Sequence, residues 1–96
     1  MLLNERDTKE GLLVSVCDPD VLGETFENGE VSLTVDEGFY DGETADEETV
    51  VQSLSRCSVA NIVGRRSVEL AVEHGFVEEG NVLEIDGTLH AQLLWL

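Results

Sequence analysis

The stretch Arg56-Cys57-Ser58-Val59-Ala60-Asn61-Ile62-Val63-Gly64-Arg65-Arg66 determines how the second half of the chain is arranged. Small and apolar residues from Ala60 to Val72 recur at helical spacing, which favours a helix over residues 58–74 that ends at Gly75. The first part of the stretch is also rich in β-branched residues, so a strand over residues 57–63 is the alternative. The helix would follow directly on an earlier one, whereas the strand would add to a sheet.

Apolar runs on either side of this stretch predict strands. Residues 2–5 and 12–17 flank a polar segment, which predicts an opening hairpin. Residues 31–35 alternate cleanly, so we expect a half-exposed strand with Val31, Leu33 and Val35 facing inward. A loop is expected over residues 36–42.

The end of the chain has the clearest local signal. Residues 82–85 and 88–95 are joined by Asp86-Gly87, the dipeptide favoured for a type I′ hairpin turn. That turn would place Ile85 opposite Thr88 and Leu83 opposite His90.

Helix signals come from caps and from an apolar stripe. Thr44-Ala45-Asp46-Glu47 matches a capping box, and Val50, Val51 and Leu54 follow it with the spacing of a buried helical face. Asp18-Pro19-Asp20 predicts one short helical turn. The order of elements predicts a single α+β domain over residues 1–96. We expect a two-layer sandwich, with two helices on one face of a mainly antiparallel sheet of about five strands.

The charge balance limits the partners that the chain can have. Its 21 carboxylates against five Lys and Arg give a net charge of −16, and they are spread along the whole sequence. At ordinary ionic strength such a surface repels nucleic acids and anionic membranes, whereas in concentrated salt it keeps a protein solvated. The sequence has no apolar run long enough to cross a bilayer and no signal peptide. We therefore expect a halophilic cytoplasmic protein with no membrane partner.

Scarce cations make the arginines of the opening stretch the first candidate site. With a helix beginning near Ser58, free backbone amides together with Arg56, Asn61, Gly64, Arg65 and Arg66 would suit a phosphate of RNA or of a nucleotide. The structural alternative pairs Arg65 with Glu69, pairs Arg66 with Glu69 or Glu73, and leaves Arg56 as a charge at a helix C-terminus.

His90 and Gln92 form a second candidate site on a strand that is otherwise apolar. A small enzyme would need His90 to meet Cys17 or Cys57, but the sequence supplies no obvious partner for proton transfer, so we assign no catalytic residue. Cysteine spacing and the acids Asp41, Glu43, Asp46, Glu47 and Glu48 match no usual metal site, so we expect neither a metal nor a cofactor.

Several short motifs together resemble a known family. They are Val14-x-Val16-Cys17-Asp18, Leu22-Gly23-x-Thr25-Phe26, Val59-Ala60-Asn61-Ile62-Val63-Gly64 and His90-Ala91-Gln92, and their order is similar to that of the archaeal domain-of-unknown-function family 424. The resemblance implies an archaeal cytoplasmic α+β protein with a role in information processing, translation in particular. It carries over no catalytic residue, and it makes Asn61, Gly64 and His90 the positions of interest.

Three functions follow as hypotheses. The first is a non-enzymatic RNA- or ribosome-associated module that uses the Arg56, Asn61, Gly64, Arg65 and Arg66 segment. The second is a homodimeric or protein-interaction module, because the apolar strand that ends at residues 93–96 would offer an open sheet edge. The third is the small enzyme that uses His90 with a cysteine.

Overall fold

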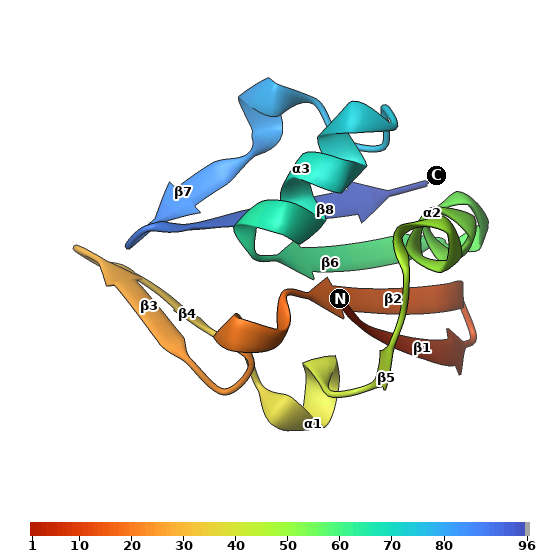
Figure 1. Ribbon diagram of the computed structural model, residues 1–96, viewed down its shortest axis with the longest axis horizontal. Helices are drawn as coiled ribbons and strands as arrows, with labels where there is room; N and C mark the ends of the chain where they lie inside the picture. The colour runs from red at the N-terminus through yellow and green to blue at the C-terminus, as the bar shows by residue number, and fades with distance from the viewer. Residues whose placement is uncertain (96) are drawn as a thin grey trace.

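The computed structural model describes residues 1–95, and Figure 1 shows a twisted main sheet with two helices across one of its faces and a smaller hairpin beside it. The sheet is built from β1 (Leu2–Thr8), β2 (Gly11–Cys17), β5 (Glu43–Thr44), β6 (Val59–Val63), β7 (Leu83–Ile85) and β8 (Thr88–Leu94). Their order is β5-β1-β2-β6-β8-β7, and among the pairs formed by residues 1–95 only β2–β6 is parallel. The α+β class is confirmed, with six strands in place of about five.

The opening stretch is a strand followed by a helix, so the predicted helix over residues 58–74 is wrong in its first part. β6 ends at Val63, and α3 (Arg65–Glu73) begins after Gly64. β6 lies between β2 and β8 and has buried residues on both faces, with Ile62 facing the helices and Val63 facing the opposite side. A strand buried on both faces has no simple alternation, which is why its spacing resembled that of a helix.

Both long helices, α2 (Glu47–Arg56) and α3, pack on the same face of the sheet, as predicted. Val50 and Leu54 of α2 and Val68 and Ala71 of α3 are fully buried there. The strands contribute small and branched side chains to the same cluster: Val14, Val16, Ala60, Ile62, Ala91 and Leu93. Burial of each such aliphatic side chain is worth about 1.5–3 kcal/mol, so this layer dominates the stability of the fold.

One end of the opposite sheet face is covered by the segment between β2 and β5. This segment contains the turn Pro19–Val21, the hairpin of β3 (Thr25–Asn28) and β4 (Val31–Thr34), and the short helix α1 (Glu37–Tyr40). The predicted strand over residues 31–35 therefore exists, but it pairs with β3 outside the main sheet, and Val31 is 48% exposed instead of facing inward. α1 also replaces part of the loop expected over residues 36–42.

The turn between β7 and β8 and the start of α2 test the hairpin and cap predictions. Asp86 and Gly87 both have positive φ, 48° and 86°, and Leu83 pairs with His90, so the predicted hairpin is confirmed. The capping box is wrong by two residues. Thr44 pairs with β1, and Asp46 caps α2 by accepting a hydrogen bond of 2.8 Å from the Thr49 amide.

Within residues 1–95, no helix combines the length and the apolar character that are needed to cross a bilayer.

Candidate functional site

The start of α3 is held by a carboxylate from a distant part of the chain. Asp18, which follows β2, accepts hydrogen bonds from the Arg66 amide at 3.0 Å, the Ser67 amide at 2.9 Å and the Ser67 hydroxyl at 2.6 Å. Gly64 permits this approach because it has φ +114° and because a Cβ atom there would overlap the Asp18 carboxyl group. Gly64 therefore has a structural role that any site at this position depends on.

This arrangement corrects the predicted phosphate site. The sequence hypothesis placed a ligand anion on free backbone amides of a helix that begins near Ser58, but residues 59–63 form β6. At the actual start of α3 the amides of Arg66 and Ser67 already bind the chain's own carboxylate. A negative group at a helix N-terminus is stabilised by the helix dipole, and Asp18 supplies it. The exposed side chains of Arg65 and Arg66 remain available to an anionic partner.

Arg65 and Arg66 are the most weakly engaged arginines of the chain. Their side chains are 56% and 70% exposed, and the nearest carboxylate oxygens lie 4.0 Å from Arg65, on Glu69 and Glu84, and 3.7 Å from Arg66, on Glu47. The expected pairing of Arg65 with Glu69 is thus present but long, while Arg66 pairs with Glu47 of α2. Neither guanidinium donates a hydrogen bond to any residue within 1–95.

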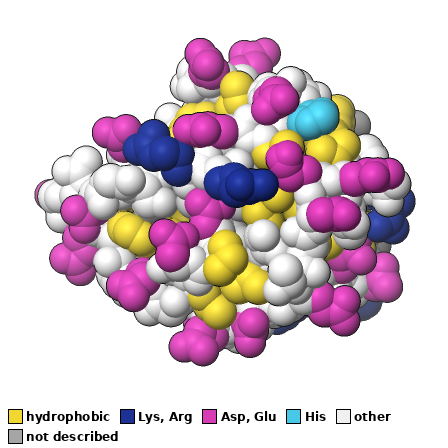
Figure 2. All heavy atoms as spheres, in the orientation of Figure 1, with side chains coloured by type: hydrophobic (Ala, Val, Ile, Leu, Met, Phe, Trp, Pro, Cys, Tyr) yellow, Lys and Arg dark blue, Asp and Glu magenta, His cyan; other side chains and the backbone are white. Residues whose placement is uncertain are grey.

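The surroundings of the two arginines are acidic. Figure 2 shows a small basic patch over the start of α3 with acidic side chains around it. Arg65 also lines a hollow of about 480 Å³ whose other charged residues are Asp18, Asp20, Glu24 and Asp86. An anionic ligand would therefore approach the outer side of the guanidinium groups, away from this hollow.

The structure separates Arg56 from this patch. Arg56 ends α2, near the beginning of β6, and donates a hydrogen bond of 2.9 Å to the Glu5 carboxylate. Glu5 also accepts a 2.6 Å hydrogen bond from the buried Ser53 hydroxyl. Arg56 is therefore part of a contact between α2 and β1.

Asn61, His90 and Gln92 lie on the sheet face away from α2 and α3. The Gln92 amide donates to the Asn61 side chain at 3.4 Å, and His90 pairs with Val63 in the next register position of β6. Burial lowers the pKa of His90, so its neutral form is favoured. These three residues form a second polar group that is separate from Arg65 and Arg66.

The cysteines do not converge with His90. Cys17, Val63 and His90 are register partners on three neighbouring strands, which places Cys17 and His90 two strand spacings, roughly 10 Å, apart. Burial raises the pKa of the Cys17 thiol to about 11, with the Asp18 charge adding to the effect. Cys57 lies at the opposite end of β6, and burial raises its pKa as well. The geometry therefore does not support proton transfer between His90 and either thiol.

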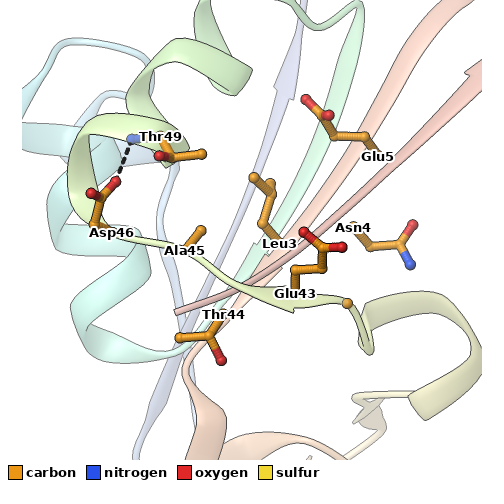
Figure 3. Close-up of a pocket in the computed structure, with 9 residues that line it drawn as sticks. Leu3, Asn4, Glu5, Glu43, Thr44, Ala45, Asp46 and Thr49 are labelled. Atoms are coloured by element: carbon orange, nitrogen blue, oxygen red, sulfur yellow. Dashed lines mark hydrogen bonds between the residues drawn. The ribbon is translucent and has the colours of Figure 1, made fainter.

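A further hollow lies between β1, β5 and the start of α2, and Figure 3 shows the residues that line it. It encloses about 570 Å³, and its carboxylates are those of Glu5, Glu43 and Asp46. Hydrogen bonding with Thr49 lowers the pKa of Asp46 and ties that carboxylate to the helix. Within residues 1–95, no group of three His, Cys, Asp or Glu side chains is arranged to hold a metal ion.

Sequence reasoning missed the role of Asp18. It assigned this residue only to the turn that follows β2, because the α3 amides that Asp18 binds are 48 and 49 residues away along the chain. The motif Cys17-Asp18 carries no local sign of that contact. Gly64 was identified as a position of interest, and its close approach to Asp18 supplies the physical reason.

Comparison with known proteins places the chain among proteins without an established activity. A family model described as a protein of unknown function, DUF424, matches residues 5–96. The fold is similar to the crystal structure of an uncharacterized conserved protein from Methanopyrus kandleri, with a TM-score of 0.77 and 22% sequence identity over 99% of this chain and 93% of that chain. At this identity the likeness establishes the fold alone. No curated protein matches the chain.

Proposed function

The chain belongs to the DUF424 family of proteins of unknown function, and we propose that it is a non-enzymatic module that contacts RNA phosphates, on the ribosome or in free RNA, through Arg65 and Arg66. The contrast among the four arginines carries this proposal. Arg6 donates to Gly38 and Asn4, and Arg56 donates to Glu5, whereas Arg65 and Arg66 donate to no side chain or carbonyl within residues 1–95. Guanidinium groups with free donors suit phosphate oxygens.

The acidic surface sets the conditions under which this contact works. We propose a salt-rich archaeal cytoplasm as the environment of the protein, since the 21 carboxylates are spread over the chain and Figure 2 shows them across the visible face. At about 1 M salt the screening length is about 3 Å, so distant carboxylates no longer repel RNA but a direct arginine–phosphate contact persists. RNA binding is therefore expected to be short-ranged and to need both arginines.

The test compares two variants of identical charge. Arg65→Gln/Arg66→Gln removes the exposed pair, and Arg6→Gln/Arg56→Gln removes the two hydrogen-bonded arginines. Binding of fluorescently labelled single-stranded RNA is measured by anisotropy at several KCl concentrations up to about 1 M. We expect the first variant to lose about tenfold or more in affinity, with a salt slope lower by about 0.7 for each lost phosphate contact.

The control separates a site from net charge. Arg6→Gln/Arg56→Gln should bind RNA as the wild type does, and the urea unfolding midpoint of Arg65→Gln/Arg66→Gln should stay unchanged. Equal losses in both variants, or RNA binding by neither the wild type nor the variants, would contradict the proposal.

A protein-interaction module that uses the edge of β8 is the second candidate function. The observation that favours it is the exposure of three large apolar side chains near this edge: Leu83 of β7, Leu94 of β8 and Trp95 just after β8 are 44%, 57% and 52% exposed. Leu96, the last residue of the predicted edge, lies outside the described residues. An exposed apolar strand edge is a template for pairing with another strand.

A further inference from the structure

Strand β8 carries two residues, Gln92 and Leu94, whose backbone N–H and C=O groups point away from β6 toward the open edge of the sheet. The Gly64 amide donates to the Leu89 carbonyl at 2.8 Å, and the Trp95 amide donates to the Ser58 carbonyl at 2.9 Å, so the odd-numbered residues of β8 direct their backbone toward β6. Successive residues of a strand alternate in this respect, and Gln92 and Leu94 therefore direct theirs to the other side. Among residues 1–95, β7 stops pairing on that side at His90.

A groove runs along this open part of the edge. It encloses about 400 Å³ between the end of β8 and the segment over residues 75–81. Phe76, Asn81 and the carboxylate-bearing Glu78 contribute to one wall, and Gln92, Leu94 and Trp95 contribute to the other. The groove therefore offers unpaired backbone groups and apolar side chains at the same place.

The other edge of the sheet is protected, and this one is not. β5 pairs with only Leu2 and Leu3 of β1, but the rest of β1 carries the charged side chains of Glu5, Arg6 and Asp7. Charged side chains on an edge strand prevent pairing with other chains. Residues 87–96, by contrast, form the longest run without Asp, Glu, Lys or Arg in the whole sequence.

We infer that a second copy of this chain occupies the β8 edge, with the two β8 strands antiparallel and with Gln92 exchanging backbone hydrogen bonds with Leu94 of the partner subunit. The inference rests on the strand-edge function proposed above and names its partner. Each copy has a net charge of −16, so most surfaces of two copies would bring carboxylates together. Antiparallel self-pairing of β8 instead brings the uncharged run of one copy against the same run of the other.

The dimer has a consequence for the RNA contact. Residues that oppose each other in antiparallel strands project to the same sheet face, so the α2–α3 layers of both copies lie on one face of a continuous sheet. Two Arg65–Arg66 pairs then face the same side. RNAs long enough to reach both pairs would bind more tightly than short ones.

The test measures the mass of the full-length protein in about 1 M KCl, where charge repulsion between copies is screened. Light scattering after size exclusion should give twice the 10.5 kDa of the chain. Gln92→Pro removes an outward-pointing N–H, which an edge strand tolerates, and Leu94→Glu places a charge on the edge. Both variants should be monomers with wild-type circular dichroism.

Val31→Glu is the matched control for Leu94→Glu, because Val31 is also an exposed apolar residue on a strand, at 48%, but lies on the β3–β4 hairpin. It should remain a dimer. Slow hydrogen exchange of the Gln92 and Leu94 amides should appear with rising protein concentration in the wild type and be absent in Leu94→Glu. A dimer that survives both Gln92→Pro and Leu94→Glu would contradict the inference and the strand-edge function together.

If the wild type is a monomer at every concentration, the inference that a second copy occupies the β8 edge is contradicted. The strand-edge function is then judged separately with a synthetic peptide of the sequence of residues 88–95. If this peptide slows hydrogen exchange of the Gln92 and Leu94 amides, the strand-edge function is supported. If exchange does not slow, the strand-edge function is contradicted. The RNA titrations with Arg65→Gln/Arg66→Gln do not depend on either result.

Discussion

The Asp18 carboxylate and Ser67 join the end of β2 to the first turn of α3. One oxygen of Asp18 accepts from both the amide and the hydroxyl of Ser67, at 2.9 and 2.6 Å, and the other accepts from the neighbouring Arg66 amide. Ser67 is fully buried. The arginine pair is therefore presented by a helix start whose position is set by a residue outside the helix.

Asp18→Ala should lower the free energy of unfolding by about 1–2 kcal/mol, because it leaves two helix amides and one buried hydroxyl without their acceptor. Urea unfolding followed by circular dichroism measures the change. Asp20→Ala, two residues away on an exposed position that makes no side-chain hydrogen bond within residues 1–95, is the control and should shift the unfolding free energy by less than about 0.5 kcal/mol. Equal effects of the two substitutions would contradict the role of Asp18.

Gly64→Ala should cost about 1–3 kcal/mol, because φ at this position is +114° and the added Cβ would overlap the Asp18 carboxyl group. Part of this cost is the overlap and part is the backbone. The Asp18→Ala background removes the overlap with the carboxyl group but keeps the contact with the Cβ atom of residue 18, at 2.7 Å. Gly64→Ala should therefore still be costly there, but less costly than in the wild type. A double-mutant cycle of urea unfolding measures the difference, and strict additivity would contradict the close contact.

The hairpin of β7 and β8 could be predicted because its signal is local. Asp86 and Gly87 both adopt positive φ, and the Asp-Gly dipeptide is itself favoured for a turn that needs this conformation. The stripe of α2 is local in the same sense, since Val50 and Leu54 lie four residues apart on one face. Elements of this kind depend on neighbours in sequence.

β6 and the candidate site depend on contacts that the sequence does not display. Ile62 and Val63 are both buried because β2, β8, the helices and the β3–β4 segment surround this strand. A strand buried on both faces has no alternation of apolar and polar residues from which its position could be predicted. Arg65 and Arg66 were correctly identified as conspicuous cations. The hydrogen bonds from the Arg66 and Ser67 amides to Asp18 could not be predicted, because the two segments are 48 and 49 residues apart in the sequence.

Glu5→Ala should destabilise the fold by about 1–2 kcal/mol, whereas Arg56→Gln should change it by less than about 0.5 kcal/mol. Glu5 is the acceptor for the fully buried Ser53 hydroxyl, and an unpaired buried hydroxyl is costly. The Arg56–Glu5 ion pair is exposed at 63% and 37%, and such pairs contribute little. Urea unfolding of both variants decides between the two contacts. A larger effect of Arg56→Gln would reverse this assignment.

Neither cysteine should react with a thiol reagent while the protein is folded. Cys17 is fully buried and Cys57 is 4% exposed, and burial raises the pKa of both thiols, that of Cys17 to about 11. The thiolate is the reacting form, so the native rate at mildly alkaline pH should follow global unfolding. Protein unfolded in guanidinium is the positive control, and two thiols per chain should react there. Rapid labelling of Cys17 in the native protein would contradict its burial.

His90 should make the fold less stable as the pH falls below its ordinary pKa of 6.5. Burial lowers the pKa of His90 in the folded protein, so below pH 6.5 the unfolded chain binds a proton that the folded chain binds more weakly. Protonation then favours unfolding, and the stability that the neutral imidazole retains above pH 6.5 is lost progressively on the acidic side.

Urea unfolding between pH 6.5 and about 5, above the range in which most carboxylates titrate, isolates this effect of His90. The wild type should lose stability across the window with a slope of no more than about 1.4 kcal/mol per pH unit, and His90→Gln should flatten that slope. His74→Gln, which leaves the imidazole of His90 in place, is the matched histidine control. An NMR titration of the imidazole protons should place the midpoint of His90 below 6.5, and a midpoint above it, or equal slopes in wild type and His90→Gln, would contradict the burial argument.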